Sequence, residues 1–197
     1  MADRFQSYQE LARVKKEGRH FIIRYRAGKT GILILAPHGG KIEAGTSELA
    51  QMIAGTEHSF YAFEGAQIQS NFRDLHLTST CFNEPLALQK AAAADVVLTI
   101  HGQGNQDESF VLVGGLDRDL AGRIATELNS RGFQVAPEQQ GLSGCNPANI
   151  CNRSRRGRGV QLEISKKLRQ RLQWDGWSQR KFVEAVRVAL RETPVSS

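Results

Sequence analysis

The sequence predicts an α/β fold, a three-layer sandwich around a mixed, mainly parallel central sheet. Short apolar runs alternate along the chain with amphipathic stretches, an order typical of βαβ units. Residues 32–36 and 96–100 are apolar at almost every position, as in strands that helices cover on both faces. At 197 residues, 40% of them hydrophobic, the chain is long enough to bury one core. We therefore expect a single domain over residues 1–197.

Each element is predicted from hydrophobic periodicity and from the residues at its ends. The expected order is a helix over 5–18, strands over 20–26 and 31–37 flanking a short AGKTG turn, a helix over 46–55, a strand over 59–65, a helix over 83–94, strands over 95–102 and 110–115, a helix over 117–132, strands over 133–137 and 159–165, and a helix over 178–192. Thr46 and Ser47 are predicted N-caps, and Asn83 is expected to cap a helix that tolerates Pro85 in its first turn. Gly132 favours a helix end.

Charge and composition narrow the class of protein. The net charge of +6 and the isoelectric point near 9.5 favour anionic partners without identifying them. No run of 18 apolar residues is present, and the first residues lack the pattern of a signal peptide, so we expect cytoplasmic synthesis and no membrane association. Three cysteines, an odd number, favour plain thiols over a disulfide framework.

Two apolar strands are each followed by a His-Gly pair. ILILAPHGG delivers His38, VVLTIHGQG delivers His101, and GVQLE adds the carboxylate Glu163. In open α/β sheets, sites form beyond the carboxyl ends of the strands. If the two strands are parallel neighbours or near neighbours, their imidazoles can converge on one point, because strands lie about 4.8 to 10 Å apart.

Two imidazoles and a nearby carboxylate predict a metal site. A catalytic zinc ion takes three nitrogen or oxygen ligands and leaves a fourth position for water. His38 and Glu43 lie on one short segment, and His101 is the remote third ligand. Glu48 is an alternative to Glu43, although its place in the first turn of the expected helix gives it a different role, since a carboxylate there favours the helix dipole.

Glu163 is the candidate general base. In GVQLEIS, Gln161 and Glu163 share one face of the expected strand. A carboxylate beside a zinc-bound water would accept its proton and pass it to the leaving nitrogen. The sequence therefore predicts a metal-assisted hydrolase, and Glu163→Gln is expected to retain zinc while losing turnover.

Four motifs in order resemble the phage-type poly-γ-glutamate hydrolases, which are zinc peptidases with a carboxypeptidase-like fold. The motifs are HGGKIEAGTSELA, DLHLTSTCFNEPLAL, VVLTIHG and GVQLEIS, and the similarity spans residues 21–172. The resemblance implies that His38, Glu43 and His101 hold one zinc ion, that Glu163 is catalytic, and that His76 contacts the substrate or a zinc ligand. It also implies cleavage of γ-glutamyl amide bonds in a bacterial capsule polymer by a phage enzyme. Because the first residues show no signal peptide, we expect release of such an enzyme when the host cell lyses.

The predicted substrate carries one free carboxylate per residue, so its binding groove should contain cations. NRSRRGRG supplies four arginines immediately before the strand with Glu163. These candidate substrate-binding residues are Arg153, Arg155, Arg156 and Arg158. The alternative is a solvated basic loop without a role in binding.

Two other functions stay open at this point. A zinc amidohydrolase acting on small N-acyl amino acids would use the same strand ends, and a basic protein that binds nucleic acid would share the arginine run. The few aromatic residues do not alternate with the arginines, which disfavours nucleic acid. We expect a monomer.

Overall fold

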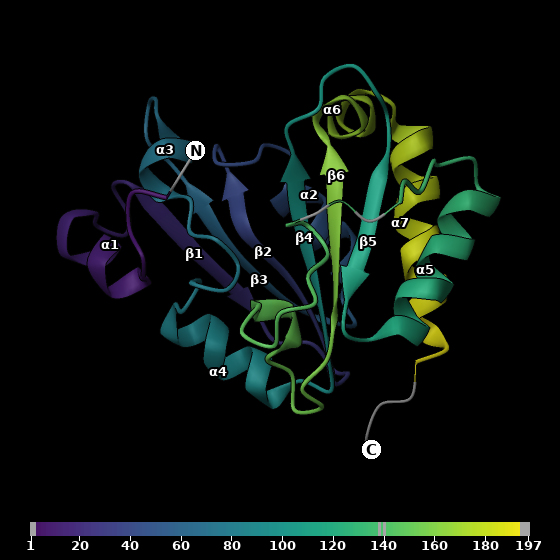
Figure 1. Cartoon of the computed structure of the whole chain (residues 1–197), viewed down its shortest axis with the longest axis horizontal. Helices are drawn as coiled ribbons and strands as arrows, with labels where there is room; N and C mark the ends of the chain where they lie inside the picture. The colour runs from purple at the N-terminus through teal and green to yellow at the C-terminus, as the bar shows by residue number, and fades with distance from the viewer. Residues whose placement is uncertain (1–2, 138, 140, 194–197) are drawn as a thin grey trace.

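The computed structural model describes residues 3–137, 139 and 141–193, and over this part of the chain it forms a six-stranded sheet (Figure 1). The strands are β1 (Phe21–Arg26), β2 (Ile32–Gly40), β3 (Ser59–Gly65), β4 (Val96–Gln103), β5 (Val111–Gly115) and β6 (Val160–Ser165). Their order is β1-β3-β2-β4-β6-β5. The four central strands are parallel, and the two edge strands β1 and β5 are antiparallel to their neighbours. The predicted mixed, mainly parallel sheet is confirmed.

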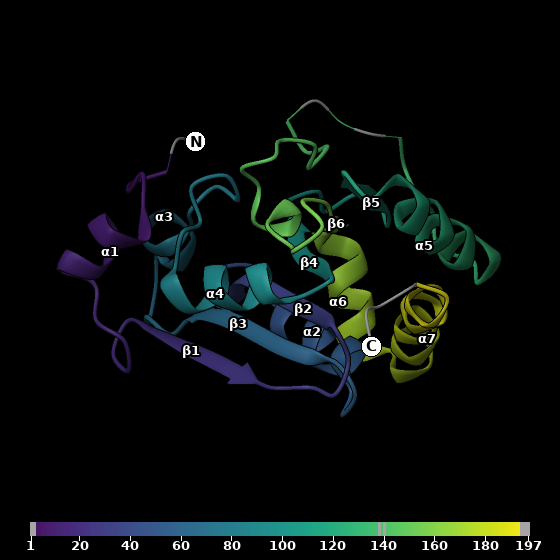
Figure 2. The same ribbon diagram turned by 90° about the horizontal axis from the view of Figure 1, so that it is seen from below.

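Helices cover both faces of the sheet. They are α1 (Tyr8–Val14), α2 (Thr46–Ala54), α3 (Asn71–Leu75), α4 (Pro85–Ala93), α5 (Arg118–Ser130), α6 (Lys166–Trp174), α7 (Gly176–Arg191) and the 3-10 helix η1 (Ile150–Asn152). Apolar residues of α2, α5, α6 and α7 form one core with one face of the sheet, and those of α1, α4 and η1 form a second core on the other face. Figure 2 shows α4 and α7 on opposite sides of the sheet. The predicted three-layer sandwich is confirmed.

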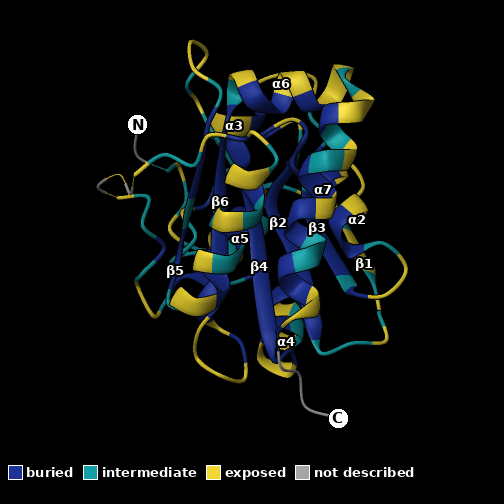
Figure 3. Cartoon of the chain, turned by 90° about the vertical axis from the view of Figure 1, so that its right-hand side faces the viewer, coloured by how far each residue is buried: buried dark blue, intermediate teal, exposed yellow. Residues whose placement is uncertain are grey.

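The central strands are buried because both of their faces are covered. On β2, Ile32 and Ile34 belong to the first core, whereas Leu33 and Leu35 belong to the second. In Figure 3 the strands are dark blue almost throughout, and the exposed positions lie in loops and on the outer sides of the helices. This burial explains the uninterrupted apolar run of the sequence.

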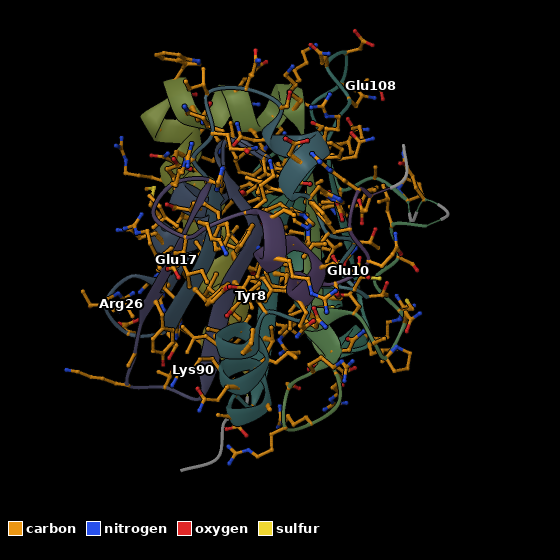
Figure 4. All side chains as sticks on the ribbon, turned by 90° about the vertical axis from the view of Figure 1, so that its left-hand side faces the viewer. Tyr8, Glu10, Glu17, Arg26, Lys90 and Glu108 are labelled. Atoms are coloured by element: carbon orange, nitrogen blue, oxygen red, sulfur yellow. The ribbon has the colours of Figure 1, made fainter. Side chains whose placement is uncertain are left out.

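Helix α1 covers the second core near the edge strand β1. The Tyr8 ring packs edge-on against Phe21 and Phe63, with ring centroids 6.1 and 6.4 Å away. Figure 4 faces this side of the molecule, with Tyr8 on α1 and Lys90 on α4. The amphipathic pattern predicted for residues 5–18 thus gives a shorter helix, which ends at Val14.

Strand β3 pairs with both β1 and β2 and lies between them. One expected strand is wrong. Residues 133–137 form no strand and contribute only an isolated bridge between Val135 and Val111. Phe133 instead turns into the first core, where its ring packs edge-on against Phe182 at 5.2 Å.

The predicted helix caps also differ. Gly45 is the N-cap of α2, and the hydroxyls of Thr46 and Ser47 bond the preceding loop: Thr46 donates to the Glu43 carbonyl at 2.8 Å, and Ser47 accepts from the Gly40 amide at 2.8 Å. The cap of α4 is Glu84, which accepts from two amides of the first turn. Asn83, one residue earlier, accepts from the amide of Tyr8.

The carboxyl ends of the four parallel strands meet at one edge of the sheet. Figure 1 shows their arrowheads at the top, with α3 and α6 close to this edge. Neither of these helices is predicted by the sequence patterns. No helix of the described ranges is both long enough and apolar enough to cross a membrane.

Candidate functional site

His38 and His101 lie side by side at the carboxyl edge of the sheet. Their strands, β2 and β4, are parallel neighbours, with Leu35 opposite Thr99. The Nδ1 atoms of the two imidazoles are 3.2 Å apart, and both side chains are buried. The structure therefore brings the two predicted histidines to one point.

A backbone carbonyl fixes the orientation of the His38 ring. The Nε2 of His38 lies 2.7 Å from the carbonyl oxygen of Leu77. Because a carbonyl only accepts hydrogen bonds, Nε2 carries the proton and Nδ1 is left to face the site. The Oε1 of Glu43 lies 3.3 Å from this Nδ1.

Glu43 is held as a buried carboxylate. Its Oε2 accepts a 2.7 Å hydrogen bond from the Gly102 amide, which directly follows His101. Burial alone would raise the pKa of Glu43, but the neighbouring His38, with smaller contributions from His101 and the Gly102 amide, lowers it to about 2. Glu48, the alternative to Glu43, is exposed in the first turn of α2.

His76, at the end of α3, is the third imidazole of the cluster. Its ring centroid is 4.1 Å from that of His38, and its Nε2 is 3.8 Å from Oε1 of Glu43. Asp3 accepts a hydrogen bond from its Nδ1 at 2.6 Å. Among the described residues, one ligand atom each from His38, Glu43 and His76 all lie within 4.8 Å of one another. His76 is therefore placed to share a cation with His38 and Glu43, in a group that does not include the predicted ligand His101.

The pKa values of His38 and His101 are shifted in opposite directions. Burial together with the neighbouring His38 lowers the pKa of His101 to about 3, which keeps this imidazole neutral. Burial also opposes protonation of His38, but Glu43 outweighs it and raises the pKa of His38. A positive charge is therefore favoured beside Glu43.

Glu163 lies on β6 directly across from His101 on β4. Burial, followed by repulsion from Glu43, raises the pKa of Glu163 to about 8. Gln161, two residues earlier on the same strand face, donates a 3.3 Å hydrogen bond to Oε1 of Glu163. A buried carboxyl group that titrates near neutral pH is suited to proton transfer.

A cavity of about 990 Å³ opens over this cluster. The three histidines, Glu43 and Glu163 all contribute to its walls. Its lining also contains three cationic side chains, Lys41, Lys166 and Arg169. Such a cavity can admit a ligand that carries negative charge.

The structure does not bring the four predicted arginines to this cavity. Arg155 pairs with Asp95 at 2.5 Å, next to the first residue of β4 and thus at the opposite sheet edge from His101. Arg158 pairs with Asp117 at 3.6 Å, and Arg153 donates to the carbonyl of Ala148 at 3.3 Å. Arg156 is exposed. In the part of the chain that the structure describes, none of the four lines the cavity.

Sequence reasoning missed two residues that contact the site. Arg169 on α6 is a buried cation whose charge interacts with Glu43 and Glu163. Asp3 accepts hydrogen bonds from His76 and from the amide and hydroxyl of Thr78. Neither belongs to a motif with His38 or His101, so no local pattern could have identified them.

Known proteins resemble this chain over most of its length. A family model described as poly-gamma-glutamate hydrolase matches residues 5–185. The chain is 38% identical over 173 residues to the SPbeta prophage-derived UPF0714 protein YoqZ of Bacillus subtilis (strain 168), covering 87% of this chain but only 62% of YoqZ. It is also 38% identical over 170 residues to the UPF0714 protein YmaC of the same organism, covering 85% of this chain and 71% of YmaC.

Two solved structures share the fold over almost the whole chain. A bacteriophage poly-gamma-glutamate hydrolase superimposes with a TM-score of 0.90 at 30% identity, covering 97% of this chain and 98% of the other. An apo, zinc-free form of YndL gives a TM-score of 0.89 at 30% identity, with the same coverage. From the match over residues 5–185, together with these relatives, it follows that the chain belongs to the poly-γ-glutamate hydrolase family.

Proposed function

We propose that this protein is a zinc-dependent hydrolase that cleaves the γ-glutamyl amide bonds of poly-γ-glutamate. The observation that carries the proposal is that Nδ1 of His38 lies 3.2 Å from Nδ1 of His101 and 3.3 Å from Oε1 of Glu43, in the wall of a cavity that Glu163 also lines. Membership of the family supports the reaction class. The zinc-free form described for YndL supports zinc as the metal.

The donor atoms fit a divalent cation. An unprotonated Nδ1 of His38 and an ionised Oε1 of Glu43, 3.3 Å apart, would repel each other unless a positive charge lies between or beside them. His101 can turn its own Nδ1 lone pair to the same point if its proton is on Nε2, where the Ser79 hydroxyl lies at 3.4 Å. Two imidazole nitrogens and one carboxylate oxygen form a donor set of catalytic zinc sites.

The residues of the chain divide the chemistry between them. When bound, zinc would supply a water molecule with a pKa near 7 and would polarise the amide carbonyl. Glu163 accepts a proton from the attacking water, and its high pKa makes it a strong enough base to do so. Gln161 occupies Oε1 of Glu163, which leaves Oε2 to hold the proton and deliver it to the leaving nitrogen.

The substrate class follows from charge and from the relatives. Lys41, Lys166 and Arg169 line the cavity, and the chain carries a net charge of +6, so a polyanion is attracted. One solved relative is a bacteriophage enzyme and another relative is prophage-derived, which supports a phage enzyme that breaches a poly-γ-glutamate capsule. His38, Glu43 and His101 would together hold a single zinc ion.

Digestion of purified poly-γ-glutamate tests the proposal. Chain length is followed on a gel with and without a chelator, and α-linked polyglutamate serves as a control of equal charge. We expect shortening of the γ-linked polymer alone, lost with chelator and restored by zinc. Cleavage of small N-acyl amino acids without shortening of the polymer would contradict the proposal and favour a small-molecule amidohydrolase. Binding of nucleic acid by a zinc-free protein would contradict it as well.

A further inference from the structure

Arg169 is held firmly at the edge of the cavity. Its side chain is only 7% exposed, although it carries a charge. Its Nε donates to the carbonyl of Ala44 at 3.0 Å, and its Nη1 donates to the carbonyls of Gln103, at 3.1 Å, and Ile164. Ala44 directly follows Glu43, Gln103 is the last residue of β4, and Ile164 lies next to the end of β6. The guanidinium therefore has a fixed position relative to these three segments.

One arm of this guanidinium has no protein partner. Among residues 3–137, 139 and 141–193, Nη2 of Arg169 donates no hydrogen bond, whereas Nε and Nη1 do. The residue is part of the cavity wall. Nη2 itself is not buried, so this arm is open to the cavity, where a ligand carboxylate can accept a hydrogen bond from it.

Gly102 makes the approach possible. A Cβ atom at this position would collide with the guanidinium of Arg169. The amide of the same glycine donates to Glu43. The guanidinium of Arg169 therefore lies against the backbone of Gly102. This glycine directly follows His101 and donates its amide hydrogen to Glu43.

Arg169 differs from the other cations of the cavity. Lys41 is exposed and Lys166 is partly exposed, so water screens their charges. Arginine also presents parallel N–H donors that match the two oxygens of a carboxylate. A buried, preorganised guanidinium is thus the better residue for recognising one particular carboxylate.

We propose that Arg169 binds, through its Nη2 arm, the free α-carboxylate of the glutamyl residue next to the bond that is cleaved. This assignment rests on the proposed function and makes Arg169 a determinant of specificity. A γ-linked glutamyl chain keeps its α-carboxylate one carbon away from the peptide nitrogen, so a cation beside the catalytic cluster can contact it while the γ-amide is cleaved. A chain without this carboxylate leaves the donor unpaired.

The test compares two sets of substrates with three proteins. The substrates are short γ-linked glutamate oligomers and the same oligomers with one residue at a time replaced by γ-aminobutyrate, which keeps the backbone but lacks the carboxylate. The proteins are the wild type, Arg169→Lys, and the control Lys41→Gln, which removes a charge from the same cavity. All are assayed with equal zinc content and matching circular dichroism spectra.

We expect the wild type to prefer the complete oligomer by on the order of 100-fold in kcat/KM when the missing carboxylate is next to the cleaved bond. Arg169→Lys should lose at least tenfold of this preference, because its kcat/KM should fall more on the complete oligomer than on the γ-aminobutyrate oligomer. Lys41→Gln should keep the preference. In that case the carboxylate and Arg169 are coupled directly.

Two results would overturn the inference. If the wild type cleaves both oligomers equally well, carboxylate recognition is excluded. This comparison does not depend on the folding of any variant. If Arg169→Lys lowers kcat/KM equally on both oligomers, Arg169 only holds the surrounding segments in place. If no γ-linked oligomer or polymer is cleaved by the zinc-loaded wild type, it is the proposed function that fails, and the inference fails with it.

Discussion

The Nδ1 of His38 and Oε1 of Glu43 face each other across 3.3 Å in an almost fully buried site, with the opposite nitrogen of His38 held by the carbonyl of Leu77. Buried charge needs a partner, and here the carboxylate, with a pKa lowered to about 2, is the group that a cation would neutralise. The relationship between these two side chains therefore predicts where a metal binds.

Loss of a residue that hydrogen-bonds a metal ligand typically weakens metal binding by roughly 10- to 100-fold. Glu43→Gln should weaken zinc binding by more than this, because a ligand oxygen itself loses its charge. Zinc stoichiometry after dialysis, measured by inductively coupled plasma mass spectrometry, checks this. Glu48→Gln is the matched control, since Glu48 is exposed on α2. A Glu43→Gln protein that keeps one zinc ion per chain while Glu48→Gln loses it would reverse the assignment.

The third metal ligand can be decided between two imidazoles. His101 has its Nδ1 3.2 Å from Nδ1 of His38, whereas His76 has one nitrogen bonded to Asp3 and the other 3.8 Å from Glu43. We expect His101→Ala to abolish zinc binding and His76→Ala to weaken it less. Titration with zinc in an isothermal calorimeter gives both affinities. The opposite ranking would transfer the ligand role to His76.

Glu163→Gln should keep zinc and lose turnover by roughly 10² to 10⁴-fold, the usual contribution of a positioned base. The carboxylate is the active form, and burial raises its pKa to about 8 in the absence of a cation. The rate should therefore fall as pH drops below the pKa of Glu163, which a bound cation shifts downward from that value. The acidic limb of the pH profile of kcat/KM should disappear in the variant. A variant with wild-type turnover would remove Glu163 from the mechanism.

The sequence predicted those features of the site that depend on local pattern and on sheet topology. His38 and His101 follow two apolar runs, and parallel neighbouring strands necessarily bring such positions together. Arg169 could not be predicted, because its position is determined by three carbonyls that are remote from one another in the chain. Only the folded structure shows which segments it joins.

The run from Arg153 to Arg158 shows where charge alone misleads. These residues precede β6, whereas Glu163 lies near its carboxyl end. Since a strand rises by roughly 3.3 Å per residue, residues before a parallel strand belong to the edge of the sheet opposite the site. The topology predicted from the sequence places the arginine run at that opposite edge, whereas the density of positive charge by itself favours a substrate-binding role.

Arg155 is therefore expected to stabilise the fold and not to bind substrate. Its Nε and Nη2 bond the buried carboxylate of Asp95 at 3.0 and 2.5 Å. Because the Arg155 side chain is half exposed, Arg155→Gln should lower the free energy of unfolding by only about 1 kcal/mol. Its KM for poly-γ-glutamate should stay at the wild-type value, which gel or reducing-end assays at several substrate concentrations check. A severalfold rise in KM without loss of stability would restore the substrate-binding role.

Asp74 should make stability depend on pH at the acidic end. Lys15 lies 2.8 Å from one of its oxygens, and Arg4 and Arg73 lie 3.0 and 3.1 Å from the other. These cations, Lys15 above all, outweigh partial burial and hold the pKa of Asp74 well below its usual range. A carboxyl group with a lowered pKa in the folded state adds stability above its unfolded pKa of about 4, and this stability is lost as pH falls through lower values.

Asp74→Asn should therefore lower the free energy of unfolding by about 2 kcal/mol at pH 7, because charge-assisted hydrogen bonds are lost. The difference from the wild type should shrink as pH falls below about 4, where the wild-type carboxyl begins to be protonated in the unfolded chain. Urea unfolding followed by circular dichroism at pH 7, 5 and 3 measures it. Glu108→Gln, at an exposed position labelled in Figure 4, is the control. A difference for Asp74→Asn that grows toward low pH would contradict the assignment, since it would require a raised pKa in the folded state.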